Sequence, residues 1–166
     1  MNCRIIDIHT HIYPVALARR AMEVTGHEND DFKKLPIREN LLARMQEARV
    51  DISVNLPVVS KPQNQGEVNR FAKETARKNI ISFGGLHPDC ENVIEELEKL
   101  KDMEMAGIKF HPPFQKVHLE DPKYEEMWRK INELGFPVLI HMGTARIVRP
   151  YDLYPSGIRK ILKSAP

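Results

Sequence analysis

Short apolar runs that lead into histidines recur along the chain, and stretches of helical character separate them. Three of these runs precede His87, His111 and His141, and the first leads into His9 and His11. Strands that alternate with helices predict a parallel sheet, and polar side chains at the carboxyl ends of such strands predict an active-site face. The chain is therefore predicted to be an α/β protein of the (β/α) barrel type.

The spacing of apolar residues predicts where the elements lie. Strands are expected at residues 4–8, 51–56, 80–86, 107–111 and 137–141. Helices are expected within 14–49 and at 64–78, 91–103, 122–134 and 156–164, with Trp128 in the core. Asp89 and Asp121 are expected to cap the helices that follow them, and Gly135 to end one of them. The irregular stretches 13–36 and 142–155 are expected on the active-site rim.

Composition limits the kind of molecule and its partners. With 166 residues, of which 42% are hydrophobic, the chain is long enough for one domain, 1–166, with one core. Its net charge of +2, with both signs interspersed, favours neither a nucleic-acid nor a membrane partner. No signal-peptide pattern or apolar run of ~20 residues is present, which favours the cytoplasm.

The two cysteines, Cys3 and Cys90, are predicted to be free thiols. Cys3 is expected to be buried, and the start of a helix could lower the pKa of Cys90.

The pair His9 and His11 follows Asp7 at intervals of two residues. Because side chains on a strand alternate between its faces, all three are expected on one face, with the imidazoles close enough to bind one metal ion. A catalytic zinc site usually takes three protein ligands. We therefore expect further ligands downstream, and the shared strand-end position predicts that the imidazoles of His9, His11 and His141 converge on one point.

Three motifs together resemble the amidohydrolase superfamily, particularly its amidohydrolase 2 branch of metal-dependent hydrolases and decarboxylases. They are Asp7-x-His9-x-His11, Gly107-Ile-Lys109-Phe-His111-Pro112 and Pro137-Val-Leu-Ile-His141-Met-Gly143. The resemblance implies a (β/α)8 barrel in which His9, His11 and His141 bind a catalytic divalent metal. Zn²⁺ is the expected ion, with Mn, Fe and Mg as alternatives.

The sequence departs from the family at its carboxyl end. The family has a further histidine after strand six and a metal-binding aspartate after strand eight, and the chain ends where strand six should begin. A complete barrel takes about 250 residues. The chain is therefore expected to hold strands one to five, as a fragment of a longer enzyme in preference to a shortened relative.

Other polar residues are assigned roles on the same grounds. Lys109 and Asp7 are the expected catalytic residues. Lys109 has three open interpretations: a carboxylated lysine that bridges two metals, a cation that binds substrate, or a core lysine paired with Asp7 or another acid. The substrate-side interpretation is preferred. The residues expected to bind substrate are His111, Arg146, Arg149 and His87, although His87 is equally expected to be structural.

The resemblance implies hydrolysis of an amide, lactone or related carbonyl bond in a small molecule, by water that the metal activates. Decarboxylation is the alternative within the superfamily, and a non-catalytic metal-binding half barrel is another. A phosphoesterase related to the TatD-type deoxyribonucleases is disfavoured, because Lys109 and His111 stand where an acid is needed. The unpaired edges of a five-stranded sheet favour a homo-oligomer.

Overall fold

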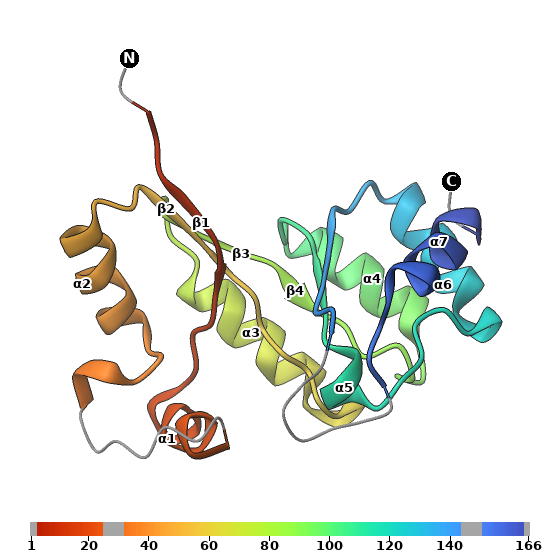
Figure 1. Cartoon of the computed structure of the whole chain (residues 1–166), viewed down its shortest axis with the longest axis horizontal. Helices are drawn as coiled ribbons and strands as arrows, with labels where there is room; N and C mark the ends of the chain where they lie inside the picture. The colour runs from red at the N-terminus through yellow and green to blue at the C-terminus, as the bar shows by residue number, and fades with distance from the viewer. Residues whose placement is uncertain (1–2, 25–31, 144–150, 165–166) are drawn as a thin grey trace.

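Strands and helices alternate along the chain as the sequence predicts (Figure 1). The computed structural model describes residues 3–24, 32–143 and 151–164. The strands are β1 (Ile6–Thr10), β2 (Ile52–Asn55), β3 (Ile80–Ser82), β4 (Gly84–Gly85), β5 (Ile108–Phe110) and β6 (Val138–Ile140). The helices are α1 (Val15–Val24), α2 (Arg38–Ala48), α3 (Gln65–Thr75), α4 (Val93–Asp102), α5 (Pro112–Gln115), α6 (Glu125–Glu133) and α7 (Pro155–Ser164).

All strand pairs in the described residues are parallel. The order is β1-β2-β3 in one sheet and β4-β5-β6 in the next, so that neighbours in space are also neighbours in sequence. The carboxyl ends of parallel strands therefore meet at one edge, where the motif histidines lie. This arrangement confirms the predicted α/β class and the five-strand part of a (β/α) barrel.

The third predicted strand differs from expectation, because Phe83 divides it into β3 and β4. The backbone N–H of Phe83 donates to Asn55 O, at 3.0 Å, whereas the N–H of Gly84 donates to Gly107 O, at 2.8 Å. The chain thus changes its pairing partner from β2 to β5 at this point. A Cβ atom on Gly84 would lie 2.6 Å from a terminal methyl group of Leu100 on α4, so a larger residue here would have to displace this buried side chain.

The start and end of α6 follow the predicted capping pattern. The Asp121 carboxylate accepts a hydrogen bond from the backbone N–H of Lys123, at 2.9 Å, in the 3-10 turn that opens the helix. Gly135 follows the helix with a φ of 67°, in the left-handed region that favours glycine. Both predictions are confirmed.

The predicted cap of α4 is wrong. The N-cap residue is Asn92, without a side-chain cap bond, and Asp89 lies in the turn before it. The Asp89 carboxylate instead accepts hydrogen bonds from the hydroxyl of Tyr124, at 2.7 Å, and from Lys123 Nζ, at 2.9 Å. The hydrogen-bond donors to this carboxylate are distant in sequence, so the spacing of nearby residues cannot predict them.

The main apolar core lies between the second sheet and the helices α4 and α6. Its buried residues include Leu97, Leu100, Ile108, Phe110, Met127 and Trp128. The Trp128 ring lies 5.3 Å from that of Phe110, and its indole N–H donates to Leu119 O, at 3.0 Å. The core role predicted for Trp128 is therefore confirmed.

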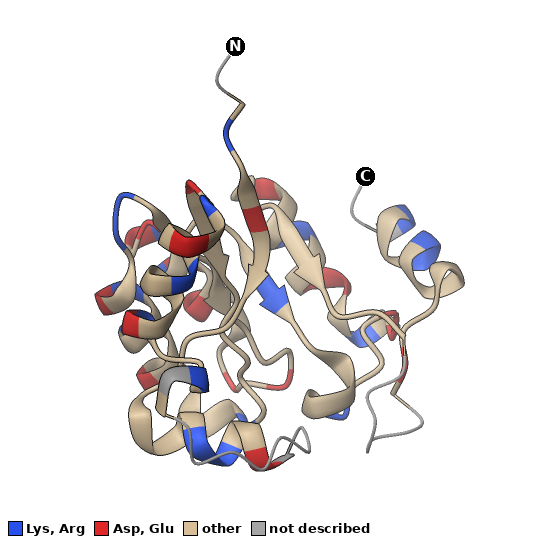
Figure 2. Cartoon of the chain, turned by 60° about the vertical axis from the view of Figure 1, so that its left-hand side comes forward, with Lys and Arg blue, Asp and Glu red and all other residues tan. Residues whose placement is uncertain are grey.

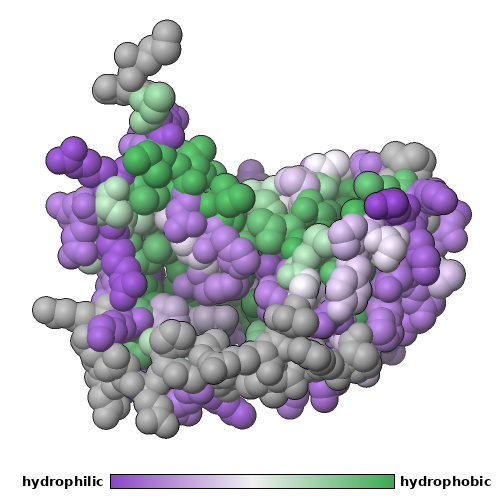
Figure 3. Space-filling model, in the orientation of Figure 1, coloured by the Kyte–Doolittle hydropathy of each residue, from purple (hydrophilic) through white to green (hydrophobic). Residues whose placement is uncertain are grey.

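The two outer strands of the five-stranded arrangement leave apolar surface exposed. On β1, the side chains of Ile6 and Ile8 are 50% and 64% exposed. At the other end, β6, α6 and α7 border an apolar groove of about 370 Å³, whose lining includes Ile140, Met142 and Leu162. Figure 3 shows hydrophobic side chains gathered over the β1 edge and continuing toward the α7 side. Surface of this kind is what a further packed element would cover.

Other surface expectations have mixed outcomes. Cys3 is exposed, which corrects the prediction of a buried thiol, because no described element covers the chain before β1. Burial raises the pKa of the Cys90 thiol, which corrects the expected lowering at the helix start. Charges of both signs are interspersed over the outer helices (Figure 2). Among the described residues, no helix has the length and apolarity that a membrane span requires.

We expect the 166-residue polypeptide to self-associate through its exposed strand edge. Replacing Ile8 by Lys places a charge on this edge and should weaken association by roughly tenfold or more, as measured by sedimentation equilibrium. Leu17→Lys is the matched control, because Leu17 on α1 is exposed to 51% but lies off the sheet. A wild-type polypeptide that sediments as a compact monomer at every concentration would contradict this expectation.

Candidate active site

His9 and His11 lie side by side at the end of β1. Their ring centroids are 5.1 Å apart, at an interplanar angle of 69°. The Nδ1 of His11 lies 2.7 Å from Leu56 O, and a carbonyl only accepts hydrogen bonds, so Nδ1 carries the proton. The Nε2 of His11 therefore keeps a free lone pair, the state that a metal ligand needs.

Lys109 and His111 occupy the end of β5. Lys109 is 1% exposed, and its Nζ has no hydrogen-bond partner among the described residues. The predicted alternative of a core lysine paired with Asp7 is therefore not what the described chain shows. Asp7 is exposed and accepts a hydrogen bond from the backbone N–H of His9, at 3.0 Å. An unpaired buried ammonium group is costly, so an anionic group placed beside Lys109 would stabilise it.

Three rings form a stack that joins β5 to β6. The His111 ring lies between two other rings. Its centroid is 4.1 Å from that of Phe114 on one face and 4.0 Å from that of His141 on the other face. The interplanar angles are 17° and 10°, so the three rings are nearly parallel. The one-turn helix α5 folds Phe114 back onto His111, and the backbone N–H of His141 donates to Phe110 O at 3.0 Å. The stack therefore fixes the ring plane of His141.

The pKa values of these groups show that they share one environment. Burial lowers the pKa of His11 to about 4 and, with the charges of His141 and Lys109, that of His111 to about 3. Burial also lowers the pKa of the Lys109 amine from 10.5 to about 8.

The two remaining imidazoles follow the same pattern. Burial lowers the pKa of His9, and the charge of Lys109 adds to this effect. Burial lowers the pKa of His141, to which the charges of Lys109 and His9 contribute. We call these five residues the histidine–lysine cluster: His9, His11, Lys109, His111 and His141.

The predicted ligands His9, His11 and His141 are near enough to affect one another's pKa values, but the described residues do not form a finished metal site. No group of three or more His, Cys, Asp or Glu side chains in the described chain is placed so that it could hold a metal ion. The donor chemistry nevertheless fits a divalent ion, because the Nε2 of His11 has a free lone pair and that of His141 is buried without a partner. The ligand roles of His9, His11 and His141 remain a prediction.

The predicted site residue His87 has its partner outside the histidine–lysine cluster. The buried ring of His87 accepts a hydrogen bond from the backbone N–H of Asp89, at 3.2 Å, and Asp89 is also the charged group that affects its pKa. This geometry agrees with the structural interpretation of His87. Arg146 and Arg149 lie outside the described residues, so their substrate-binding role stays a prediction.

Sequence reasoning missed two side chains of the site. Phe114 stacks on His111, and its position three residues along a one-turn helix was the available signal. The charge of Asp152 opposes part of the lowering that burial causes in the pKa of His141, and the Asp152 Oδ1 is buried without a hydrogen-bond partner among the described residues. The N–H of Gly143 donates to Leu153 O, at 3.4 Å, which returns this segment to the end of β6. An acid in the rim stretch 142–155 was the signal for Asp152.

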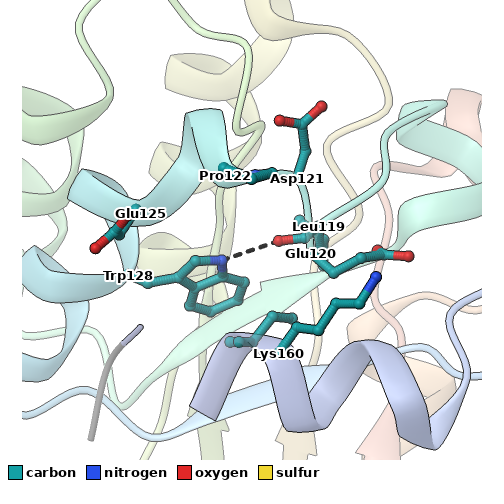
Figure 4. A pocket seen from close by; sticks show the side chains of 8 residues that line it. Leu119, Glu120, Asp121, Pro122, Glu125, Trp128 and Lys160 are labelled. Carbon is teal, nitrogen blue, oxygen red and sulfur yellow. Dashed lines mark hydrogen bonds between the residues drawn. The ribbon is translucent and has the colours of Figure 1, made fainter. Parts of the chain in front are cut away.

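A second hollow lies away from the histidine–lysine cluster. It measures about 240 Å³ and is lined by residues of α6, α7 and the segment between α5 and α6, including Glu120, Glu125 and Lys160 (Figure 4). The indole N–H of Trp128 points across its floor to Leu119 O. No residue that lines this hollow belongs to the predicted site.

Parallel strands with helices between them, and titratable side chains gathered at the carboxyl strand ends, define the chain as part of a (β/α)8 barrel with an active-site face. A family model described as Amidohydrolase matches residues 6–160. The chain belongs to this amidohydrolase family, as its motifs indicated.

Solved structures support the barrel fold. The IDCase of Metarhizium anisopliae in its apo form is 13% identical, with a TM-score of 0.66, over 95% of this chain and 53% of that one. A 5-carboxyvanillate decarboxylase of Novosphingobium aromaticivorans, complexed with manganese and 4-hydroxy-3-methoxy-5-nitrobenzoic acid, is 16% identical, with a TM-score of 0.67, over 86% and 51%. The 2,6-dihydroxybenzoate decarboxylase of Rhizobium is 17% identical, with a TM-score of 0.61, over 97% and 61%.

The chain thus spans between about half and three fifths of the length of these solved structures. A search of the curated proteins finds no match to it.

The buried cluster makes the stability of the metal-free chain depend on pH in two steps. His11 and His111 have folded-state pKa values below the ordinary 6.5, so the unfolded chain binds more protons and the free energy of unfolding should rise from pH 4 to 6.5. Lys109 should add a second rise between pH 8 and 10.5, worth about 3 kcal/mol at most.

Urea denaturation with a chelator present measures both steps. Lys109→Met should be more stable than the wild type at pH 7 and should lack the second rise, while keeping the first. Lys101→Met is the control, since Lys101 is exposed on α4. Identical pH profiles for wild type and Lys109→Met would contradict the buried, unpaired state of Lys109.

Proposed function

We propose that the chain forms the metal-binding part of an amidohydrolase-family enzyme that acts on a small organic acid. The observation that carries this proposal is Lys109, a buried amine that has no hydrogen-bond partner within the described part of the chain and whose charge acts on the neighbouring imidazoles. With its pKa of about 8, it is mostly protonated at neutral pH. A substrate carboxylate is the group that an ammonium in such a place binds most strongly.

His9, His11 and His141 are the residues that would hold a divalent metal, because neutral imidazole is its commonest nitrogen ligand. A bound ion supplies Lewis-acid polarisation of a carbonyl or carboxylate oxygen. The protein contributes the orientation of each ring: Leu56 O fixes His11, and the stack on His111 fixes His141. Lys109 binds and orients the substrate carboxylate between them, and His111 lines the same space.

Decarboxylation is the reaction that we favour, and hydrolysis of an amide or lactone is the second candidate. Two of the solved structures named above support the first choice, since one is a 5-carboxyvanillate decarboxylase that holds manganese and the other is a 2,6-dihydroxybenzoate decarboxylase. Both reactions place the reacting carboxyl or carbonyl group against the same cation and imidazoles. The remaining strands of a complete barrel would supply the further acid and base groups that either reaction needs.

The metal site is tested first, on the 166-residue chain. Wild type should bind Mn²⁺ or Zn²⁺ in isothermal titration calorimetry, and the double variant His9→Ala, His11→Ala should lose this binding while keeping its helical circular dichroism. His118→Ala is the control, because His118 is exposed outside the cluster. Equal metal affinity in the double variant and the wild type would overturn the ligand assignment.

The reaction is tested on the protein expressed from its full native gene, as wild type and as Lys109→Met, each loaded with Mn²⁺ or Zn²⁺. Release of CO₂ from hydroxybenzoates should exceed hydrolysis of lactones and amides. Lys109→Met should raise the KM for a carboxylate substrate by about 10-fold to 100-fold, the loss expected for one charge-assisted hydrogen bond. Bound metal without turnover of any of these substrates would favour a non-catalytic metal-binding module instead.

A further inference from the structure

Four buried side-chain amides hold the carboxyl ends of the strands together. They are Asn55, Gln65, Asn69 and Gln115, with exposed fractions of 0%, 2%, 3% and 5%. We call them the amide belt. In each of them the amide oxygen accepts a hydrogen bond from a backbone N–H at the end of a strand or just after it: Ile12, His87, Gly85 and His111, at 2.7–3.0 Å.

The belt answers a requirement of parallel sheets. Beyond the last ladder bond a backbone N–H loses its strand partner, and a buried N–H without a partner costs about 1–3 kcal/mol. A side-chain amide offers an acceptor and a donor without bringing a charge into the interior. Each belt amide also donates through its nitrogen, for example from Gln115 to Leu86 O, at 2.6 Å.

At β1 the belt member Asn55 is part of a closer arrangement. The Oγ1 of Thr10 donates to Val54 O, at 2.9 Å, and the ring of His11 donates to Leu56 O, at 2.7 Å. Between them, the N–H of Ile12 donates to the Oδ1 of Asn55, at 3.0 Å. Three consecutive residues at the end of β1, Thr10 to Ile12, are thus bonded to three consecutive residues at the end of β2, Val54 to Leu56.

Asn55 is the side chain in this arrangement that reaches across to a third strand. Its Nδ2 donates to the Oγ of Ser82 on β3, at 3.3 Å, so that the acceptor offered to Ile12 is itself anchored. The pairing of β1 with β2 shifts register between Asp7 and Thr10, and the N–H of Leu56 donates to Thr10 O, at 2.9 Å, just before His11. The bond from Ile12 to Asn55 holds the backbone on the other side of His11.

We propose that Asn55 is a positioning residue for His11. By holding the N–H of Ile12, Asn55 keeps the backbone of His11 where its Nδ1 reaches Leu56 O, which leaves Nε2 unprotonated and correctly aimed. The relevance of this aim to metal binding rests on the proposed function. The positioning itself is a property of the metal-free chain.

The belt supplies a matched control. Asn69 is a buried amide like Asn55, and its side chain is paired with the backbone of Gly85 through both its oxygen and its nitrogen, at 2.8 and 2.9 Å. Gly85 is outside the histidine–lysine cluster. Asn69→Leu should therefore destabilise the chain, as Asn55→Leu does, but without altering His11.

The test measures the ring tautomer of His11 by ¹⁵N NMR of the metal-free chain at neutral pH. Wild type and Asn69→Leu should show His11 protonated at Nδ1, whereas Asn55→Leu should show a mixture with the Nε2-protonated tautomer. Asn55→Asp keeps the acceptor for Ile12 and should restore the wild-type tautomer. A pure Nδ1 tautomer in Asn55→Leu would overturn the proposal.

Two further measurements complete the test. Hydrogen exchange of the wild type should show a slow Ile12 N–H, and a fast one would overturn the proposal even if Asn55→Leu does not fold. Affinity for Co²⁺ should fall about 10-fold to 100-fold in Asn55→Leu, with a changed visible spectrum, and no more than slightly in Asn69→Leu. A wild type that binds no Co²⁺ would refute the proposed metal site, while the tautomer and exchange results would still decide the role of Asn55.

Discussion

The hydrogen bonds made just beyond the last ladder bonds of the parallel strands govern the rest of this structure. Where the ladder stops, backbone N–H groups must find other acceptors, and the chain provides side-chain amides such as Asn55 and Gln115. These bonds fix the backbone at His87 and His111 and, through Ile12, the backbone next to His11. The positions of the side chains in the candidate site therefore depend on the hydrogen bonds at the carboxyl ends of the strands. The helices outside contribute the core against which the strands are held.

Much of the fold could be predicted because its signals are local. Strand-length apolar runs, the Asp121 cap and the Gly135 helix end each depend on residues close in sequence. The interruption at Phe83 could not be predicted in this way, because it depends on a change of hydrogen-bond partner. The N–H of Phe83 bonds to Asn55 and that of Gly84 bonds to Gly107, and both acceptors are distant in sequence. The same holds for Asp89, because its carboxylate accepts hydrogen bonds from Lys123 and Tyr124, which are more than 30 residues away in sequence.

The candidate site was predictable in composition and less so in arrangement. The two-residue spacing of His9 and His11 already placed their rings together, as their 5.1 Å separation shows. Spacing says nothing about the partner of His11 Nδ1, which is a backbone carbonyl 45 residues away. The contact of His111 with His141 also depends on the pairing of β5 with β6. Side-chain direction at a strand end is a tertiary property, which explains why residue types were easier to foresee than their geometry.

The division of the strands into two sheets has a consequence for how the molecule folds. Each β/α unit closes over a short stretch of chain, so its contacts have low sequence separation and form early. The histidine–lysine cluster instead joins β1, in the first sheet, to β5 and β6, in the second. Contacts of this kind have a high sequence separation, so we expect them to form only after the two sheets meet at Phe83. The site would then be assembled after most of the secondary structure has formed.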